Sequence, residues 1–157
     1  MARKHTIDTW IIQYYDRVLA LALRLVGNED DAMDCAQNVF ISAWKKFDSF
    51  RGESHPMAWL KRITYNTCFN HLNREKARGW DELDETRHAD VPFPSGQQRS
   101  FDPALLKILS PSERSVLIAR VYDDLSFREV AEALETTENS AKVSYHNAIK
   151  KLREVML

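Results

Sequence analysis

Apolar residues recur at the three-and-four spacing of an amphipathic helix along most of this chain, and few segments alternate with the period of two that a half-buried strand needs. The sequence holds only 4 glycines and no apparent internal repeat. Sheet-containing folds require period-two or continuous apolar runs that are bounded by turn residues. The pattern therefore predicts an all-α fold.

An acidic, proline-containing stretch at residues 79–102 interrupts the helical pattern. It holds 2 Lys and Arg residues against 6 Asp and Glu residues, whereas residues 1–78 hold 12 against 9 and residues 103–157 hold 8 against 8. Such a composition without apolar periodicity is typical of a flexible linker. The sequence thus predicts two small helical domains, 1–78 and 103–157, joined by an acidic linker, 79–102.

Three helices are expected in the first domain, over residues 8–26, 29–47 and about 56–76. Gly27 tolerates the left-handed conformation that ends a helix, and Pro56 suits a first helical position. A polar loop is expected between the second and third helices.

Three short helices are expected in the second domain, and two of them have the same start signal. Ser110 with Glu113, and Ser126 with Glu129, have the spacing of a capping box. The last helix is expected to start near Thr137, only a short turn after the second one. The last two of these helices, joined by so short a turn, indicate a helix-turn-helix unit, which binds duplex DNA through its second helix.

The second helix carries an isoleucine on its polar side. A rotation of about 100° per residue groups five residues opposite the apolar stripe: Asp34, Gln37, Asn38, Ile41 and Lys45. One interpretation is a docking face for a partner helix, with Ile41 as the apolar anchor. The other is a solvated face with one isolated apolar residue, which is common in soluble proteins.

The third helix interleaves cations, amides and aromatic rings on its side away from Leu60 and Ile63. Single-stranded DNA is bound in this way, because Lys and Arg attract its phosphates while unpaired bases stack on rings. The alternative is that Tyr65 and Phe69 pack beneath the preceding loop, as we expect of Trp59. The residues on this side are Arg62, Tyr65, Asn66, Phe69, Asn73 and Lys76.

The outer side of the last helix has no acidic residue between Asn139 and Arg153. Its N-terminal members are placed to meet base edges in a major groove, and Lys150 and Arg153 to meet phosphates. A charged, solvated helix is the alternative interpretation. The side comprises Asn139, Lys142, Val143, His146, Asn147, Lys150 and Arg153.

The sequence lacks the residues that a catalytic or metal-binding function would need. The sequence has no glycine-rich phosphate loop, nucleophile elbow or HExxH motif. Cys68 and His71 have the spacing of two ligands, whereas zinc normally takes three or four. We therefore expect no catalytic residue, no cofactor, no metal and no small-molecule substrate. A nucleic-acid enzyme with a metal at Cys68 and His71 is a further alternative.

The composition also bears on location. No window approaches an uninterrupted membrane span, and the N-terminus lacks the apolar run of a secretory signal. Cys35 and Cys68 lie in helical stretches without C-x-x-C spacing, which suits a reducing compartment. We expect a soluble cytoplasmic protein.

Two long runs of this sequence resemble one known family, the extracytoplasmic-function sigma factors of bacterial RNA polymerase. The first is DDAMDCAQNVFISAWKKFDSFRGESHPMAWLKRITYNTCFNHL, and the second is LSPSERSVLIARVYDDLSFREVAEALETTENSAKVSYHNAIKKLRE. The resemblance covers nearly the whole chain. It implies that residues 1–78 are sigma region 2, that residues 103–157 are sigma region 4, and that the chain directs core polymerase to promoters.

The resemblance also implies three sets of site residues. Asp34, Gln37, Asn38 and Ile41 would grip the coiled coil of the largest polymerase subunit. The loop from Ser49 to Ser54 would join the third helix in melting and reading the minus-ten element, through Arg51, Arg62, Tyr65, Asn66, Phe69, Asn73 and Lys76. The duplex minus-thirty-five element would be bound by Arg128, Asn139, Lys142, Val143, His146, Asn147 and Lys150.

Members of this family are usually restrained by an anti-sigma factor, which is often bound to the inner membrane. The resemblance also implies that the linker of this chain, residues 79–102, crosses toward the RNA exit path. The chain departs from the family pattern at several positions. Asn38 replaces an acid, Glu135 replaces the glycine of the turn, and Val143, Ser144 and Asn147 replace Ser, Arg and Arg. The promoter sequence is therefore not predicted. A stand-alone helix-turn-helix regulator with a helical sensing or dimerisation domain is the alternative function.

Overall fold

The computed structural model describes residues 2–52, 54–78 and 103–156, and within these ranges every regular element is a helix, which confirms the all-α prediction. None of these helices is long and apolar enough to cross a membrane. The elements in chain order are α1 (Ala2–Val26), α2 (Glu29–Lys45), the 3₁₀ helix η1 (Phe47–Ser49), α3 (Pro56–Ala77), α4 (Pro103–Leu106), α5 (Pro111–Tyr122), α6 (Phe127–Leu134) and α7 (Glu138–Met156).

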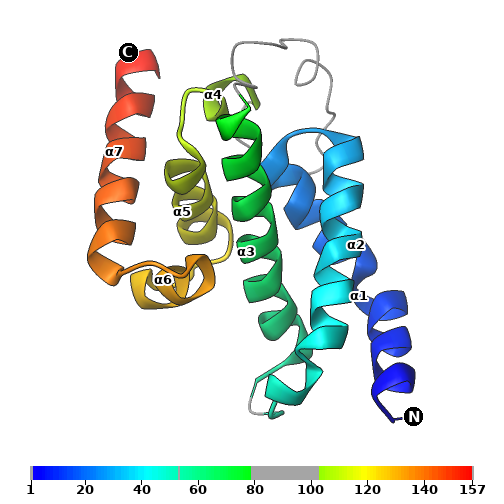
Figure 1. Cartoon of the computed structure of the whole chain (residues 1–157). Coiled ribbons are helices and arrows are strands. Elements are labelled where there is room, and N and C mark those ends of the chain that lie inside the picture. Colours follow the sequence, from blue (N-terminus) through cyan, green and yellow to red (C-terminus); the bar gives the residue numbers. More distant parts are fainter. Residues whose placement is uncertain (1, 53, 79–102, 157) are drawn as a thin grey trace.

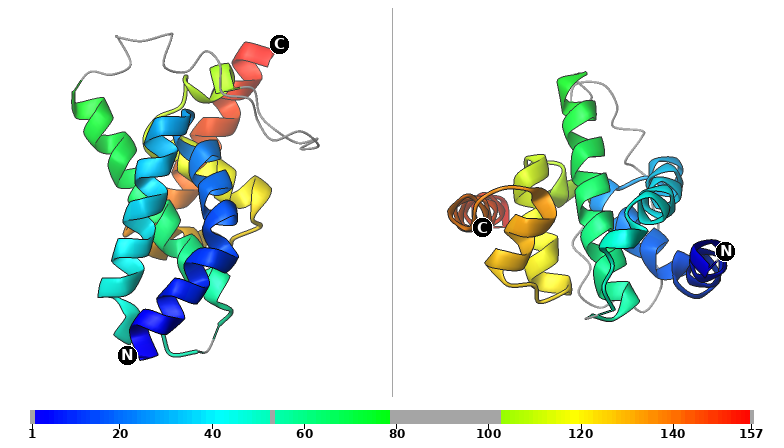
Figure 2. Two further views of the ribbon diagram at one scale, coloured as in Figure 1. Left: turned by 90° about the vertical axis from the view of Figure 1, so that its right-hand side faces the viewer. Right: turned by 60° about the horizontal axis from the view of Figure 1, so that its bottom comes forward.

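Helix α3 lies at the centre of the molecule. Helices α1 and α2 pack along one side of it, and α5 and α6 contact its other side (Figure 1). Helix α7 packs on α5 and α6 and forms the outer layer of the C-terminal half. A view from the end of the bundle shows α3 between the two groups (Figure 2). The side of α3 that faces away from α1 and α2 therefore lies against the C-terminal half.

The helix boundaries in the N-terminal half follow from local sequence signals. Gly27 has a positive φ of 85° and ends α1, and the Asn28 side chain then accepts a hydrogen bond from the Asp31 backbone N–H at the start of α2. The His55 ring accepts from the Met57 N–H and caps α3, with Pro56 at the first helical position. These interactions satisfy backbone groups that a helix end leaves open.

Two boundaries and one element differ from the sequence expectation. Helix α1 begins at Ala2 rather than at residue 8, because Ile7 also packs into the core of the bundle. Helix α2 ends at Lys45, and the chain tightens into η1 where we expected continued α-helix and loop. The short helix α4 had no predicted counterpart.

Both predicted capping boxes are present in the C-terminal half. Ser110 and Ser126 accept from the N–H groups of Glu113 and Glu129, and both glutamates accept from the serine backbones in return. Glu135, which replaces a family glycine, takes the left-handed conformation at φ 58° after α6. A residue other than glycine costs about 1 kcal/mol in that conformation, so this turn retains its geometry at some expense of stability.

An aromatic cluster lies at the end of the N-terminal half near η1. The Trp10 ring contacts the rings of Phe47, Phe50 and Trp59 at centroid distances of 5.7, 5.1 and 5.8 Å. The ring of Trp59 also lies 5.2 Å from that of Phe50. Trp59 therefore packs against the preceding loop as predicted. Because Phe50 belongs to this cluster, the cluster also fixes the start of the loop that carries the exposed Arg51.

The two halves share an apolar cluster that the sequence did not predict. Leu21, Leu25 and Leu72 from α1 and α3 belong to the same buried cluster as Leu106 and Leu117 from the C-terminal half. Burial of apolar surface stabilises by about 25 cal/mol per Å², so a joint core holds the halves together.

A buried arginine crosses this contact. Arg114 on α5 donates to the Leu25 carbonyl oxygen at the end of α1 (3.2 Å) and to the Leu106 carbonyl oxygen at the end of α4 (2.9 and 3.2 Å). Burial lowers the pKa of Arg114 to about 10, so its guanidinium still carries its charge at neutral pH. The cation thereby satisfies carbonyls at two helix C-termini, where the helix dipole favours positive charge.

Candidate functional site

The predicted face on α2 is exposed along its length. Asp34, Gln37 and Asn38 are exposed, and the Ile41 side chain is 51% exposed. Gln37 and Ile41 border a groove of about 470 Å³ between α1 and α2. The groove is apolar because Ile7, Ile11, Phe40 and Trp44 also line it. Ile41 thus belongs to a continuous apolar surface rather than standing alone among polar groups.

Two members of this groove were missed from the sequence. Trp44 follows Ile41 by three residues and is 41% exposed, and Ile11 contributes from the neighbouring helix α1. The spacing of Trp44 was a usable signal, since residues three apart share a helix face. Exposed apolar residues that gather in one groove mark an interaction surface more often than isolated ones do.

The predicted nucleic-acid face of α3 differs most from expectation. We expected its aromatic rings to be available to unpaired bases, but Tyr65 is only 1% exposed. Its hydroxyl donates to the carboxylate of Asp123, the residue that follows α5. Burial, and secondly the charge of Asp123, raise the pKa of Tyr65 well above its ordinary value, which keeps the hydroxyl protonated.

Phe69 is likewise half-buried, packed against the shared apolar cluster. The expectation of two open stacking rings is therefore wrong for this conformation, and so is the alternative in which both rings pack beneath the preceding loop. The physical reason is the same for both residues. Their side of α3 faces the C-terminal half rather than solvent.

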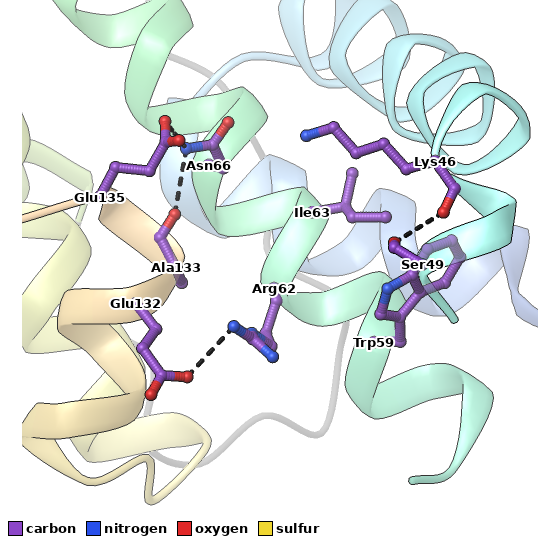
Figure 3. Close-up of a pocket in the computed structure, with 9 residues that line it drawn as sticks. All are labelled: Lys46, Ser49, Trp59, Arg62, Ile63, Asn66, Glu132, Ala133 and Glu135. Atoms are coloured by element: carbon purple, nitrogen blue, oxygen red, sulfur yellow. Dashed lines mark hydrogen bonds and ion pairs between the residues drawn. The ribbon is translucent and has the colours of Figure 1, made fainter. Parts of the chain in front are cut away.

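Polar residues of the same α3 face also contact the C-terminal half. Arg62 Nη2 donates to Glu132 Oε2 at 3.1 Å. The Asn66 amide donates to the Ala133 carbonyl oxygen at 3.0 Å and to Glu135 Oε1 at 3.1 Å. Figure 3 shows these contacts around a pocket of about 340 Å³ that Lys46 and Trp59 also line.

The remaining predicted minus-ten residues lie apart from this contact. Asn73 and Lys76 are exposed near the end of α3, and Arg51 is exposed in the loop beyond η1. Of the seven predicted minus-ten residues, the structure therefore places four beneath the C-terminal half and leaves three in solvent. The four are Arg62, Tyr65, Asn66 and Phe69.

The predicted reading face of α7 is open. Ala141, Ala148 and Leu152 are buried against α5 and α6, and the opposite side is exposed as predicted. A shallow groove of about 570 Å³ runs along its C-terminal part, bordered by His146 and Lys150. The exposed members are Asn139, Lys142, Val143, His146, Asn147, Lys150 and Arg153.

Arg128 is also exposed, at the start of α6. Its Nε lies 3.6 Å from Glu132 Oε1, so one carboxylate contacts both Arg128 and Arg62. Such exposed pairs contribute only about 0.2–1 kcal/mol each. Arg128 therefore remains available to another anion at small cost.

Cys68 and His71 have separate partners. The thiols of Cys68 and Cys35 contact each other, and the pKa of Cys68 is raised by its hydrogen bond to Cys35 and by burial. His71 Nε2 lies 3.3 Å from Asp31 Oδ2. Within residues 2–52, 54–78 and 103–156, no three His, Cys, Asp or Glu side chains are grouped as a metal site would require.

Two family models match this chain. The model for sigma-70 region 2 matches residues 10–78, and the model for sigma-70 region 4 matches residues 103–152. Together the matched ranges cover most of the chain, in the order that the sequence resemblance implied.

Curated relatives extend the similarity across the chain. The RNA polymerase sigma-E factor of Streptomyces avermitilis is 29% identical over 143 residues, which cover 88% of this chain and 78% of that protein. The ECF RNA polymerase sigma factor SigW of Bacillus subtilis is 26% identical over 157 residues, covering 90% of this chain and 83% of that protein.

A solved structure has a similar fold. It is the sigma factor RpoE of Bartonella quintana in its co-crystal with the anti-sigma factor NepR, and it superposes with a TM-score of 0.68 at 25% identity. The similarity covers 95% of each chain, so the likeness includes both helical halves.

Proposed function

The chain belongs to the sigma-70 family as an extracytoplasmic-function sigma factor that directs RNA polymerase in transcription initiation, and from this premise we propose how its surfaces divide that work. Residues 1–78 bind core polymerase and open the minus-ten element, and residues 103–157 bind the minus-thirty-five element. Residues 79–102, which lie outside the described residues, link the two and cross toward the RNA exit path. The chain itself performs no catalytic chemistry and needs no cofactor.

The single observation that carries the polymerase assignment is the apolar groove beside Ile41. Gln37 and Ile41 line it, with Asp34 and Asn38 exposed on the same helix. An apolar side chain on the outer face of a coiled coil of the largest polymerase subunit would fit such a groove, and polar groups beside it would suit the rim. The groove is open in the free chain, so docking requires no prior rearrangement.

The minus-thirty-five assignment is supported by the open face of α7. Its exposed N-terminal half offers the amides of Asn139 and Asn147 and the ring of His146, which can hydrogen-bond base edges, and Val143 can contact a thymine methyl group. Lys142 and Lys150 offer cations, with Arg128 on the preceding helix. These residues suit a duplex whose phosphates position the helix and whose base edges select the sequence.

The minus-ten assignment concerns the melted strand. Lys76 and Arg51 offer exposed cations, while Arg62, Tyr65, Asn66 and Phe69 form the stacking and hydrogen-bonding centre once α3 is uncovered. Asn73 lies on the same side of α3 toward its end. A flipped base would stack on one ring while the cations hold the backbone on either side of it.

We also propose an anti-sigma partner and a cytoplasmic location. The B. quintana relative was crystallised with an anti-sigma factor, and its likeness covers nearly all of this chain. A membrane-bound anti-sigma factor would hold this chain at the inner membrane until a signal releases it.

Mixing the purified chain with core polymerase tests the polymerase assignment. The chain should co-elute with core as a stoichiometric complex, and the complex should protect a promoter upstream of a start site. A stand-alone regulator would instead bind duplex DNA by itself and fail to co-elute with core.

Substituting Lys150→Ala tests the phosphate role of α7. The slope of log affinity for minus-thirty-five duplex against log salt should become shallower by about 1, because one fewer counterion is released. The loss should be similar for matched and mismatched duplexes, whereas His146→Ala should reduce only the preference between them.

Lys4→Ala provides the charge-matched control, since Lys4 is exposed on α1 in the other half. An unchanged salt slope for Lys150→Ala, measured by fluorescence anisotropy, would remove Lys150 from the phosphate contact.

A further inference from the structure

Helix α7 is joined to the first turn of α5 by two polar contacts. The hydroxyls of Ser112 and Ser144 share a hydrogen bond, with 2.7 Å between the two oxygens. Lys151 Nζ donates to Glu113 Oε1, also at 2.7 Å. Figure 1 shows α7 running alongside α5, and Ser112 and Glu113 are consecutive residues at the start of α5. Both contacts therefore act between the same two helices.

Ser144 and Lys151 lie on the same flank of α7. They are seven positions apart, and a rotation of about 100° per residue separates them by only about 20° around the helix axis. This flank lies between the buried side of the helix, which includes Ala148, and Asn147 of the reading side. Two contacts on one flank, about two helical turns apart, resist rotation of α7 about its axis.

The Glu113 carboxylate is fixed by its own helix. It is buried, and it completes the capping box by accepting from the Ser110 N–H at 3.0 Å. Burial alone would raise the pKa of Glu113, but the hydrogen bonds from Lys151 and from the Ser110 backbone outweigh it. The pKa is therefore lowered, and the carboxylate is charged at neutral pH. An ionised acceptor that is held in place forms a stronger contact with Lys151 than a mobile, exposed pair would.

The apolar contacts of α7 define its rotation less sharply. Ala141 and Ala148 on its buried side are small, and apolar packing has no directional requirement. On the other flank, the Tyr145 ring contacts the Phe127 ring of α6 at a centroid distance of 5.6 Å. Hydrogen bonds, in contrast, weaken steeply when donor and acceptor turn away from each other. The contacts of Ser144 and Lys151 therefore specify a rotational position that packing alone leaves less defined.

A small rotation of α7 would displace the reading side chains from base edges. Side chains extend about 5 Å from the helix axis, so a rotation of about 20° moves their ends by about 2 Å. The donor–acceptor distances of good hydrogen bonds span only about 0.5 Å. A long lysine such as Lys150 can follow a phosphate through such a shift, whereas the short amide side chain of Asn147 cannot follow a base edge. Sequence selection should therefore suffer more than attraction to DNA.

Resting on the proposed minus-thirty-five role of α7, we propose that the first turn of α5 forms a brace that sets the rotation of the reading helix. The brace consists of the contacts from Ser112 to Ser144 and from Glu113 to Lys151. Ser144 and Lys151 are then positioning residues, which act on promoter choice through the reading side chains. Ser144 is also a departure from the family pattern, and the arginine of that pattern would leave Ser112 without this hydroxyl partner.

Discrimination between two duplexes tests the brace. One duplex carries the minus-thirty-five element of a promoter that the holoenzyme uses, and the other has one base pair of that element changed. Fluorescence anisotropy with the full chain gives both affinities, and their ratio is the readout. A substitution that only loosens the fold lowers the free energy of unfolding, measured with urea, and leaves this ratio unchanged.

Two substitutions remove the brace without touching the reading side. Ser112→Ala removes the hydroxyl from α5, and Lys151→Met removes the cation and keeps an unbranched stem. Each should lower the ratio about threefold and the combined variant about tenfold, because one hydrogen bond contributes a factor of that order. Glu113 is left unchanged because it also caps α5.

The matched control is Ser42→Ala with Lys4→Met, which makes the same two changes in the N-terminal half. Neither residue belongs to a proposed DNA-binding set, so the control should keep the wild-type ratio. Ser144→Ala is compared with Ser112→Ala, because the two substitutions remove the same hydrogen bond and should have equal effects on the ratio.

Two results would overturn the brace. The first is a ratio in the combined variant that lies within a factor of about two of the control. The second is a loss of discrimination in Ser144→Ala but not in Ser112→Ala, because Ser144 would then contact DNA itself. Failure of the proposed function looks different: a wild-type ratio near one would contradict the minus-thirty-five role of α7, and the brace with it, before any variant is compared.

Discussion

Ile41→Asp is expected to lower the affinity of the chain for core polymerase by about 100-fold, which corresponds to about 2.7 kcal/mol. Ile41 borders the apolar groove between α1 and α2, next to Phe40 and Trp44. With aspartate at this position, a partner side chain seated in the groove would lose an apolar contact. The new carboxylate would be buried without water or a counter-charge. Because Ile41 is half exposed in the free chain, the fold should be retained. Titration of labelled core polymerase with each variant measures the loss.

Ile12→Asp is the matched control for this experiment. Ile12 is 85% exposed on α1 and does not line the groove, so the same substitution there should leave the affinity within a factor of about two. Equal affinities for wild type and Ile41→Asp, with circular dichroism showing intact helices in both, would place the polymerase contact elsewhere on the chain.

Arg114→Ala is expected to lower the free energy of unfolding by about 3 kcal/mol. The substitution removes three hydrogen bonds to the carbonyl oxygens of Leu25 and Leu106, and it leaves a cavity where the guanidinium and its stem were buried. Relief from burying a charge offsets part of this loss, but two buried carbonyls would remain without these donors. Urea unfolding followed by circular dichroism measures the change.

Arg114→Met separates the two contributions. Methionine fills much of the same volume and removes the buried charge, so it should destabilise less than alanine does, while both lack the donors. An unfolding free energy for Arg114→Ala within about 0.5 kcal/mol of wild type would mean that Arg114 does not hold the halves together.

Features that depend on neighbouring residues could be predicted from the sequence. The capping boxes at Ser110 and Ser126, the end of α1 at Gly27 and the proline start of α3 each involve residues within one helical turn of one another. The exposed sides of α2 and α7 followed from helical periodicity alone, because each helix buries one stripe and leaves the opposite side to solvent.

The contact of the C-terminal half with α3 could not be predicted in this way. Tyr65 and Asp123 are 58 positions apart, and Asn66 and Glu135 are 69 apart, with no local pattern that links them. A helix side rich in Arg, Asn and Tyr has the same sequence pattern whether a partner covers it or not. Glu132 and Glu135 became informative only when the fold placed them opposite Arg62 and Asn66.

Arg114 was missed for a related reason. It follows directly after the capping residue Glu113, and an arginine in that position usually reaches solvent. Here the carbonyls at the ends of α1 and α4 converge on it, and that convergence is a property of tertiary packing. Trp44, unlike Arg114, could have been predicted from the sequence, because its spacing of three residues from Ile41 places both on one side of α2.

The central claim is that this chain turns core polymerase into a promoter-specific enzyme, and run-off transcription tests it most directly. Core polymerase, the purified chain and fragments of the source genome are combined, and the 5′ ends of the transcripts are mapped. We predict discrete start sites that appear only when the chain is present and disappear with Ile41→Asp. Identical transcripts with and without the chain, at concentrations that saturate core, would contradict the account.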